Sequence, residues 1–317
     1  MNKDLISLAE LSREEILAIC DDAARLKAEL RAGSGSRPLV GRTLAMIFEK
    51  PSLRTRVTFE TGVKQLGGAS VYLTHEDIRL GERETVADIA RNLSRWVDLI
   101  VARTFSHHTL VELAHHATIP VINGLTDLSH PCQVLADLLT LREHRGPDLS
   151  RLEVAFVGDG NNVVNSWIEA AGRVGFGFRL GCPKGYEPDA GILAAAQERQ
   201  PGRVRVVHDP VEAVRGVDAV YTDVWTSMGQ EAETERRRLD FSGYQVNAAL
   251  LAHAKPDALV MHCLPAHRGE EITADVLEGP RSVVFDEAEN RLHAQKAVMV
   301  RLHERMQSGR ARQENPK

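Results

Sequence analysis

Short apolar runs alternate with longer amphipathic stretches along most of the chain. The runs are rich in Val, Ile, Leu and Phe, which is typical of buried strands, and the stretches between them have a helical apolar period. Because strands that alternate with helices form parallel sheets with right-handed crossovers, the pattern predicts an α/β fold. The runs cover residues 43–49, 69–73, 97–102, 119–122, 152–158, 177–182, 204–208, 218–223, 258–264 and 282–285.

The amphipathic segment 131–146 divides these runs into two series, and it ends at a Gly-Pro dipeptide, a typical helix stop. A chain of 317 residues is also long for a single hydrophobic core. We therefore expect two doubly wound parallel-sheet domains, residues 1–140 and 141–289, joined by interdomain helices, with an active site in the cleft between them. A last helix is expected at roughly 288–307, within a segment, 290–317, that packs back on the first domain.

Composition and charge narrow the classes of partner. The chain has a net charge of -5 and no clustered Lys/Arg stripe, so we expect no nucleic-acid partner. No uncharged run approaches the roughly 18 apolar residues that suggest a membrane span, so no membrane partner is expected. The opening stretch MNKDLISLAELSREEILAIC contains no apolar signal segment, and Ser12 and Glu15 have the spacing of a helix capping box.

The four cysteines are scattered and form no CxxC pair. Such usage suits a reducing compartment and argues against a disulfide framework or a zinc ribbon. Together with the opening stretch, it leads us to expect a cytoplasmic protein. The cysteines are Cys20, Cys132, Cys182 and Cys263.

Polar and reactive residues gather directly after six of the predicted strands. Ligands of open α/β sheets bind outside the carboxyl ends of the strands, so these segments are the candidate sites. They are KPSLRTR (50–56), RTFSHH (103–108), NGLTDLSHPCQ (123–133), DGNN (159–162), DVWTSMGQE (223–231) and CLPAHRGEE (263–271).

The segment 52–56, SLRTR, combines a strand end, a preceding proline and hydroxyls that can cap a helix. Free N–H groups and the helix dipole make such a junction an anion site, and the Arg54 guanidinium is suited to phosphate. Arg54 and Arg56 face different ways on a helix, so we expect Arg54 to meet the ligand and Arg56 to form a structural ion pair. The segment is not a P-loop, and a capped helix with solvated arginines is the alternative.

The segment VGDGNN resembles a nucleotide-binding turn, because two glycines follow a predicted strand. The dinucleotide fingerprint would need a third glycine where Val163 stands, and the acid expected after the next strand is also missing. A tight turn that presents Asn161 and Asn162 to a small polar ligand is the second interpretation.

His130 and Gln133 lie three residues apart at the start of the expected linking helix. Side chains at this spacing share one helix face, so both can point at one ligand. Helix capping is the competing explanation.

His262 and Cys263 suggest a nucleophilic pair, but adjacent residues of a strand point to opposite faces. A buried structural cysteine is therefore the competing explanation. The histidine doublets at 107–108 and 115–116 lack a carboxylate pattern such as HExxH, and we expect no metal.

Taken in order, seven motifs resemble those of the aspartate/ornithine carbamoyltransferase family: SLRTR, ART (102–104), HPCQ (130–133), DGNN, DVWTSMG, HCLP (262–265) and EAENR (287–291). The resemblance runs from about residue 5 to 305 and so covers nearly the whole chain. SxRTR and HPxQ mark the wider family, whereas DxxxSMG and HCLP are similar to its ornithine-using members. The resemblance implies transfer of the carbamoyl group of carbamoyl phosphate to the δ-amino group of L-ornithine, giving L-citrulline and phosphate in arginine metabolism, with no cofactor.

The resemblance also implies the residues of the site. Those expected in catalysis are Arg103, His130 and Cys263. Those expected to hold carbamoyl phosphate are Ser52, Leu53, Arg54, Thr55, Arg79, Arg103, His130, Gln133, Cys263, Leu264 and Arg291. Those expected to hold ornithine are Asn162, Asp223, Ser227 and Met228. Leu53 stands where many relatives have Thr, which is compatible with binding through its backbone N–H, and the Leu264–Pro265 peptide bond is expected to be cis.

The resemblance further implies a homotrimer with active sites at subunit interfaces. A loop of the neighbouring subunit reaches each site, and Arg79, in THEDIRLGERET (74–85), stands at the reaching position where relatives often have Gln or His. The segment 225–240 carries the charged run EAETERRR and is expected to be a solvated, mobile lid, with an ordinary exposed loop as the alternative.

Three alternative functions remain open. A related carbamoyltransferase that acts on acetylornithine, putrescine or another amine could share most of these motifs, because such pockets differ by few residues. A nucleotide-dependent oxidoreductase would need the missing glycine and acid. A non-catalytic homologue would not need the matched set Arg54, His130 and Cys263.

Overall fold

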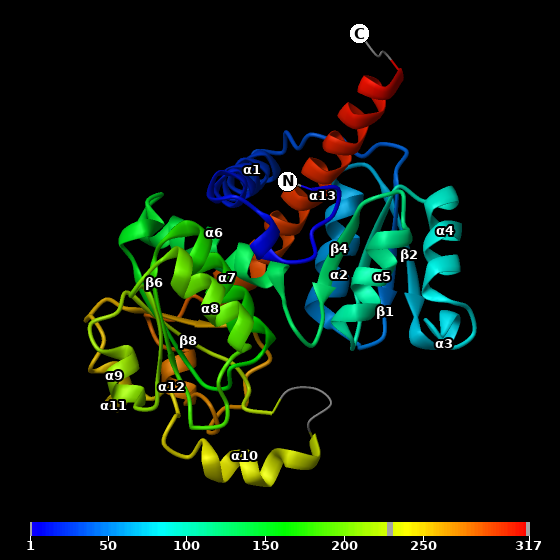
Figure 1. Ribbon diagram of the computed structural model, residues 1–317. Helices are drawn as coiled ribbons and strands as arrows, with labels where there is room; N and C mark the ends of the chain where they lie inside the picture. The colour runs from blue at the N-terminus through cyan, green and yellow to red at the C-terminus, as the bar shows by residue number, and fades with distance from the viewer. Residues whose placement is uncertain (1, 227–230, 315–317) are drawn as a thin grey trace. The chain divides into compact units, whose positions relative to one another are not determined.

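The computed structural model describes residues 2–226 and 231–314, in which helices and parallel strands alternate along the chain (Figure 1). The chain divides into two compact units, of which unit 1 comprises residues 1–139 and 290–317 and unit 2 comprises residues 140–289. The described strands of each unit form one parallel sheet, so the predicted α/β fold class is confirmed.

The sheet of unit 1 has four strands in the order β2-β1-β3-β4. These strands are β1 (Thr43–Phe48), β2 (Ala69–Thr74), β3 (Leu99–Arg103) and β4 (Val121–Leu125). The helices that lie wholly in unit 1 are η1 (Leu8–Glu10), α1 (Arg13–Arg31), α2 (Leu53–Gln65), α3 (His75–Ile78), α4 (Val86–Trp96) and α5 (His107–His116). Two further helices, α6 (Pro131–Arg145) and α13 (Val284–Glu314), contribute residues to both units.

Apolar side chains of α4 and α5 cover one face of the unit 1 sheet. Leu93 and Leu110 lie there in one buried cluster with Ile47 and Ile100 of the strands. α2 packs closely against α13, since a Cβ atom on Gly62 would lie 3.1 Å from Cγ of the Lys296 side chain. The core therefore fixes the carboxyl ends of β1, β3 and β4, from which the candidate residues project.

The sheet of unit 2 has five strands in the order β7-β6-β5-β8-β9. These strands are β5 (Glu153–Val157), β6 (Gly177–Gly181), β7 (Val204–Val207), β8 (Ala219–Thr222) and β9 (Leu259–His262). The helices are η2 (Leu149–Arg151), α7 (Asn162–Val174), α8 (Ala190–Arg199), α9 (Pro210–Val214), η3 (Glu231–Glu233), α10 (Thr234–Asp240), α11 (Ala248–Leu251) and α12 (Ala274–Leu277).

Successive residues of β5 and of β8 belong to different clusters of buried side chains, as expected for strands that are buried on both faces. Phe156 and Tyr221 stack with ring centroids 5.2 Å apart, and Tyr221 also meets Trp167 of α7. Ala155 and Val220 belong instead to the buried cluster that includes residues of α9, α11 and α12. Helices thus cover both faces of the sheet, which leaves its carboxyl edge for polar side chains.

The strand predicted at 282–285 is wrong. Ser282 forms an isolated bridge with Val260, and α13 begins at Val284, so it is longer than the expected helix. The valines suggested a strand, but Asp286 and Glu287 lie in the first turn of α13, where carboxylates favour a helix N-terminus. The other nine predicted strands are present with small shifts at their ends.

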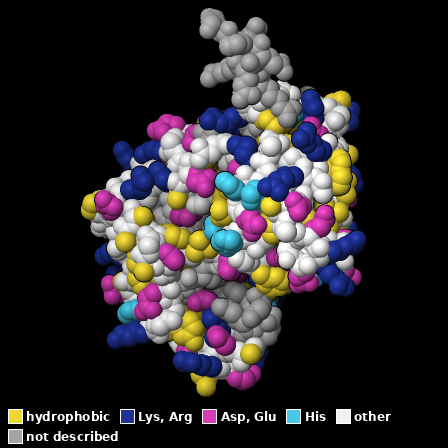
Figure 2. All heavy atoms as spheres, turned by 45° about the vertical axis from the view of Figure 1, so that its right-hand side comes forward, with side chains coloured by type: hydrophobic (Ala, Val, Ile, Leu, Met, Phe, Trp, Pro, Cys, Tyr) yellow, Lys and Arg dark blue, Asp and Glu magenta, His cyan; other side chains and the backbone are white. Residues whose placement is uncertain are grey.

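Acidic and basic side chains are interspersed on the face of the molecule drawn in Figure 2. Within the described residues, no helix combines the length and the apolar character needed to cross a bilayer. The capping box expected at Ser12 and Glu15 is present, which confirms the predicted start of α1.

Candidate active site

Three neighbouring strands of unit 1 deliver the candidate residues to one edge of the sheet. Ser52 follows β1, Arg103 is the last residue of β3, and His130 lies between β4 and α6. The order β1-β3-β4 makes these strands direct neighbours, and parallel strands end at the same edge. These three donors therefore come together because each lies at the end of a buried strand or a few residues beyond it.

The N-terminus of α2 is capped by Ser52, whose hydroxyl accepts a hydrogen bond from the N–H of Thr55 at 3.3 Å. Leu53 is the first residue of the helix, and its side chain is 75% exposed. The remaining N–H groups of the first turn and the helix dipole favour an anion at this end.

Arg291 of α13 ties two of the other candidates together. It donates to the Oε1 atom of Gln133 and to the Oγ1 atom of Thr55, the latter at 3.2 Å. The Nε2 atom of Gln133 in turn donates to Asp137 at 2.8 Å, so both ends of the Gln133 amide have a partner that fixes its orientation. All four side chains are buried, and their mutual bonds preorganise this part of unit 1.

His130 is buried and lies in a positive environment. Burial lowers the pKa of His130 well below its ordinary 6.5, and the charges of Arg291, Arg103 and Arg54 lower it further. The imidazole is therefore uncharged at neutral pH and can donate a hydrogen bond without carrying a proton for transfer. Three guanidinium groups around a neutral histidine make a region suited to an anion with an adjacent polar oxygen.

The two arginines of SLRTR have different surroundings. Arg56 forms an ion pair with Glu60, with Nε and Oε2 3.8 Å apart, and its guanidinium lies 3.7 Å from the ring centroid of Tyr72. The structural ion pair predicted for Arg56 is thus confirmed. Arg54 is half-buried and acts electrostatically on His130.

Arg79 ends α3 with a left-handed backbone conformation, at φ of 42°, and its side chain is exposed. Its contact with a phosphate bound in a neighbouring subunit stays a prediction.

Unit 2 gathers a second group at the carboxyl ends of the neighbouring strands β5, β8 and β9. The Asp223 carboxylate accepts hydrogen bonds from the Nδ2 atom of Asn161 at 2.9 Å and from the N–H of Val224 at 2.8 Å. The Sγ atom of Cys263 lies 3.0 Å from Oδ1 of Asp223. Asp223 is buried, and the two donors named above are neutral. A cationic ligand group beside this carboxylate would therefore find a charge partner.

The Asn161 side chain accepts from the N–H groups of Val163 and Val164 and so caps α7. Asn162, the predicted ornithine ligand, is the first residue of that helix. The other two predicted ornithine ligands, Ser227 and Met228, lie outside the described residues. The bond to Asp223 shows that Asn161, which was not among the predicted ornithine ligands, also belongs to this group.

Leu264 has a left-handed backbone conformation, and the predicted cis bond between Leu264 and Pro265 is confirmed. The Nδ1 atom of His262 accepts from the N–H of Leu264 at 2.9 Å, and its Nε2 atom lies 3.1 Å from Oε1 of the buried Glu271. Nε2 therefore carries the proton, and the histidine orients the backbone next to Cys263.

The opposite-face argument for His262 and Cys263 does not hold, because β9 ends at His262. Ligand atoms of Asp223, His262 and Cys263 lie within 4.8 Å of one another, which makes them the one group in the described part of the chain that could hold a metal ion. Both ring nitrogens of His262 already have hydrogen-bond partners, so metal binding would have to break one of those bonds.

The DGNN turn resembles a nucleotide-binding turn in sequence, but the chain leaves no space for a pyrophosphate beside Gly160. A Cβ atom at Gly160 would lie 2.5 Å from the backbone of Glu187 and Pro188. The glycine is therefore needed for packing of the chain against itself, rather than for approach of a pyrophosphate.

The buried contacts of Arg237 were missed by sequence reasoning, which placed it in a solvated run. Its Nη1 atom donates to Asp159 and to the carbonyl of Trp225, both at 2.9 Å, and its Nε atom pairs with Glu233 at 3.0 Å. Burial raises the pKa of Asp159, while Arg237 opposes that shift. No periodic signal marks a single buried arginine among three adjacent ones, so only the structure could find it.

Comparisons with known proteins agree with this arrangement. Residues 3–143 match the carbamoyl-P binding domain of aspartate/ornithine carbamoyltransferase, and residues 150–302 match its Asp/Orn binding domain. An ornithine carbamoyltransferase of Syntrophus aciditrophicus is 56% identical over 94% of this chain and 99% of its own length. The solved ornithine carbamoyltransferase from Pyrococcus furiosus has a TM-score of 0.91 at 51% identity, covering 93% of this chain and 95% of that one. A mutant N-acetyl-L-ornithine transcarbamylase has a TM-score of 0.84 at 31% identity, covering 94% of this chain and 99% of that one.

Both domains of one enzyme class, the carbamoyltransferases, are thus matched in sequence over nearly the whole chain. The chain belongs to the aspartate/ornithine carbamoyltransferase family, which confirms the predicted resemblance. This assignment sets aside a nucleotide-dependent oxidoreductase.

Proposed function

We propose that this chain transfers the carbamoyl group of carbamoyl phosphate to the δ-amino group of L-ornithine, giving L-citrulline and phosphate. One observation carries the proposal: unit 1 gathers three guanidinium groups around the uncharged His130, whereas unit 2 offers the carboxylate of Asp223 beside Cys263. The first group suits an anionic carbamoyl donor and the second a cationic amino acid. The identities of 51% and 56% to ornithine carbamoyltransferases support ornithine as the acceptor.

The phosphate group binds at the N-terminus of α2. Ser52 and Leu53 offer backbone N–H groups there, Thr55 offers its hydroxyl, and Arg54 adds a guanidinium that can bond two phosphate oxygens. Leu53 contributes no side-chain donor, which is compatible with binding through its backbone. Gln133 and Arg291 hold Thr55 in place and complete this side of the pocket.

Arg103, His130 and Thr55 stabilise the charge that develops during transfer. The δ-nitrogen attacks the carbamoyl carbon, a C–N bond forms, the C–O bond to phosphate breaks, and the leaving phosphate takes up the proton that the amine loses. Negative charge grows on the carbamoyl oxygen in the transition state, and loss of one preorganised donor to such an oxygen costs about 3–4 kcal/mol. A neutral His130 serves as a donor to that oxygen, and Cys263 and Leu264 complete the pocket.

Unit 2 holds ornithine through Asp223, with Asn162, Ser227 and Met228 around the rest of the molecule. Asp223 binds the α-amino group, and Cys263 lies near the reacting nitrogen. An alkyl amine with a pKa of about 10 is almost wholly protonated at neutral pH, and binding it uncharged costs on the order of 4 kcal/mol. Burial disfavours the charged amine, so a closed pocket lowers this cost.

The active enzyme is a homotrimer whose sites lie at subunit interfaces, with Arg79 of a neighbouring subunit contacting the phosphate. Leu53 and Val57 lie one turn apart on α2, and both they and Val71 of β2 have exposed apolar side chains. Exposed apolar residues on adjacent elements are typical of a surface that another protein covers. Sedimentation of the purified chain tests this, since a monomer with full activity contradicts it.

The enzyme works in the cytoplasm, in arginine biosynthesis. Cys20, Cys132 and Cys182 are buried and belong to no disulfide, which supports a reducing compartment. Burial raises the pKa of the Cys132 and Cys182 thiols to about 12, which keeps them unreactive.

The function is tested by measuring product formation from carbamoyl phosphate with ornithine, N-acetylornithine, putrescine and aspartate in parallel. We expect citrulline and an equal amount of phosphate with ornithine, at a kcat/KM at least about 100-fold above that for the other amines. The solved N-acetyl-L-ornithine transcarbamylase at 31% identity makes N-acetylornithine the specific rival. Activity with N-acetylornithine but not with ornithine contradicts the proposed substrate.

A further inference from the structure

Residues 263–273 connect β9 to α12 and carry Cys263 and Leu264, which the proposed function places in the pocket. Leu264 has a φ of 57°, in the left-handed region that residues with a Cβ atom rarely adopt. A residue other than glycine keeps such a conformation only where its surroundings hold it there. The groups that hold this turn therefore decide where Cys263 and Leu264 lie.

The ring of His262 is one group that holds the turn. Its Nδ1 atom accepts a hydrogen bond from the N–H of Leu264 at 2.9 Å. Because Nδ1 accepts this bond, the ring is in the neutral tautomer that carries its proton on Nε2. In the other tautomer the N–H at Nδ1 would face the N–H of Leu264, and the bond would be lost. The turn thus depends on which nitrogen of His262 carries the proton.

The carboxylate of Glu271 stabilises the tautomer that the turn requires. Its Oε1 atom lies 3.1 Å from the Nε2 atom of His262, and both side chains are fully buried. Oε1 also accepts from the N–H of His267 at 2.6 Å, so two donors meet at this oxygen and it serves as an acceptor. An acceptor at Nε2 favours the proton on that nitrogen and leaves Nδ1 free to accept from Leu264.

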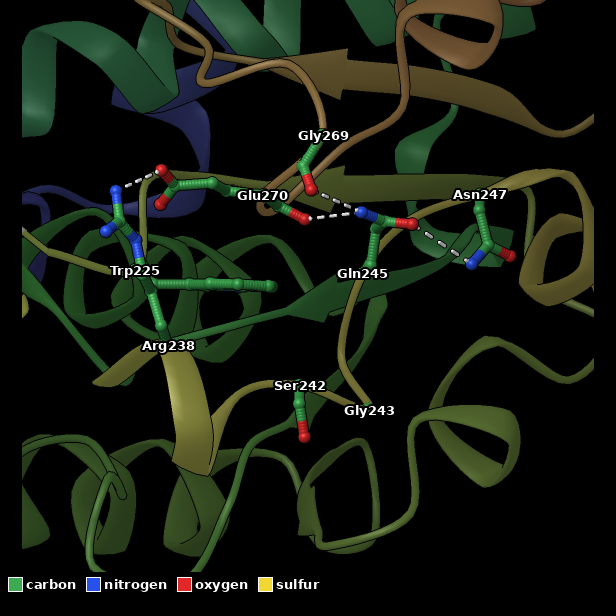
Figure 3. A pocket seen from close by; sticks show the side chains of 8 residues that line it. All are labelled: Trp225, Arg238, Ser242, Gly243, Gln245, Asn247, Gly269 and Glu270. Carbon is green, nitrogen blue, oxygen red and sulfur yellow. Dashed lines mark hydrogen bonds and ion pairs between the residues drawn. The ribbon is translucent and has the colours of Figure 1, made fainter. Parts of the chain in front are cut away.

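Hydrogen bonds to the backbone hold Glu271 itself in place. Gln245 donates from Nε2 to the carbonyls of Gly269 and Glu270, at 2.8 and 2.9 Å (Figure 3). The N–H of Val246 donates to the carbonyl of Glu271 at 2.8 Å. Three consecutive carbonyls are therefore bonded, and this anchored segment presents the carboxylate of Glu271 to His262.

A separate set of bonds holds the backbone of His262. Its N–H donates to Oε2 of the buried Glu287 at 3.1 Å, and the hydroxyl of Tyr221 donates to Oε1 of Glu287 at 3.0 Å. Tyr221 therefore provides a matched control. Removal of its hydroxyl breaks a buried hydrogen bond close to His262 without removing either bond of the His262 ring.

We propose that His262 and Glu271 are positioning residues for the carbamoyl transfer. Glu271 fixes the tautomer of His262, and His262 holds the backbone of Leu264, so that Cys263 and Leu264 lie where the reaction needs them. This inference rests on the proposed function, because it assigns Cys263 and Leu264 to the pocket. A misplacement of about 1 Å in a site can lower the rate roughly 100-fold, so the effect is expected mainly on kcat.

Variants of Glu271 test the proposal in citrulline assays. Glu271→Leu removes the acceptor with little change in size and should lower kcat by about 10- to 100-fold. Within the described residues, Oε2 of Glu271 has no hydrogen-bond partner, so Glu271→Gln can keep the Oε1 acceptor without breaking a bond at Oε2. We expect Glu271→Gln to retain a kcat within about threefold of the wild type. The KM for carbamoyl phosphate should stay within about threefold in both variants, because its phosphate binds in unit 1.

Tyr221→Phe shows whether loss of any buried hydrogen bond in this region has the same effect. It should lower the melting temperature, since it leaves an acceptor of Glu287 without its donor, but keep kcat within about threefold of the wild type. A loss of kcat below threefold in Glu271→Leu overturns the proposal. An equal loss of kcat in Tyr221→Phe and Glu271→Leu overturns it as well.

Two variants of His262 keep the proposal testable if a thermal melt shows that Glu271→Leu does not fold. In His262→Asn the side-chain oxygen can take the place of Nδ1 and accept from Leu264. In His262→Gln the amide nitrogen can take the place of Nε2, but the acceptor for Leu264 is lost. We expect a higher kcat for His262→Asn than for His262→Gln, and a kcat of His262→Gln that equals or exceeds that of His262→Asn overturns the proposal.

Hydrogen exchange of the Leu264 N–H distinguishes failure of this inference from failure of the proposed function, because it requires no turnover. We expect slow exchange in the wild type and in Glu271→Gln, and exchange faster by about tenfold or more in Glu271→Leu. Equal exchange in the wild type and Glu271→Leu overturns the positioning role alone. A wild type that forms no citrulline contradicts the proposed function, and the role of both residues in the transfer with it.

Discussion

The two units gather polar side chains at the same place, the carboxyl edge of a parallel sheet, but with opposite chemistry. In unit 1, three arginines surround a buried, neutral His130. In unit 2, the Asp223 carboxylate is held by the amide of Asn161 and faces the thiol of Cys263. The fold positions such groups, but the residues that follow each strand decide whether the edge suits an anion or a cation.

The largest effect is expected from Arg103 of unit 1. Arg103→Ala should lower kcat/KM by about a thousandfold or more, because it removes a donor to the developing oxyanion and a charge near the phosphate. Steady-state citrulline assays measure this. Arg103→Lys keeps the charge without the planar fork and should recover only part of the activity, and a loss below tenfold in Arg103→Ala would contradict the assigned role.

Asp223→Asn tests the proposed role of unit 2 in binding the substrate amine. We expect kcat/KM for ornithine to fall by about 100- to 1,000-fold, since a charge-assisted bond to the substrate amine is replaced by a neutral one. The KM for carbamoyl phosphate should change less than threefold. Equal losses for both substrates would show that the two units do not divide the substrates as proposed.

Arg54 and Arg56 form a matched pair within unit 1. Arg54→Ala should lower kcat/KM for carbamoyl phosphate by about 10- to 100-fold, whereas Arg56→Ala loses an exposed ion pair and a ring contact and should cost less than about threefold. Kinetic assays of both variants at one ornithine concentration measure the difference. Similar losses in the two variants would contradict the assignment of Arg56 to structure.

The smallest expected effect is a decrease in the free energy of unfolding at low pH. The pKa of His130 is lower in the folded chain than its ordinary 6.5, so the unfolded chain binds the extra proton first as pH falls. The free energy of unfolding should therefore decrease below pH 6.5, by at most about 1.4 kcal/mol per pH unit from this group. His130→Gln should lack this contribution.

Denaturant titrations of the wild type and His130→Gln at several pH values measure that difference. The subtraction also removes contributions shared by both proteins, such as that of Asp159, whose raised pKa acts in the opposite direction. Parallel curves for the two proteins would show that His130 titrates normally.

The sheets could be predicted from the sequence because buried parallel strands form short continuous apolar runs between amphipathic helices. The prediction of a tenth strand at 282–285 was wrong because two acidic residues favour the first turn of α13 there. Helix boundaries depend on such local competition, which apolar periodicity alone does not resolve.

The positions of candidate residues could be predicted where they lie at or shortly after the end of a strand, as at Ser52, Arg103 and Asp223. Arg291 lies on the last helix, and only the family motif pointed to it, because a bond between Arg291 and Thr55 has no local sequence signal. Arg237 was missed for the same reason, since its partner Asp159 lies 78 positions away in the chain. Contacts of this kind depend on tertiary packing, which spacing along the chain does not encode.

The division of the substrates between the units is tested most directly by calorimetric titration of carbamoyl phosphate in the absence of ornithine. Wild type, Arg54→Ala and Asp223→Asn are compared under one set of conditions. We predict that Arg54→Ala weakens binding by about 10- to 100-fold while Asp223→Asn stays within about threefold of the wild type. Equal weakening in both variants, or weakening in Asp223→Asn alone, would contradict the account.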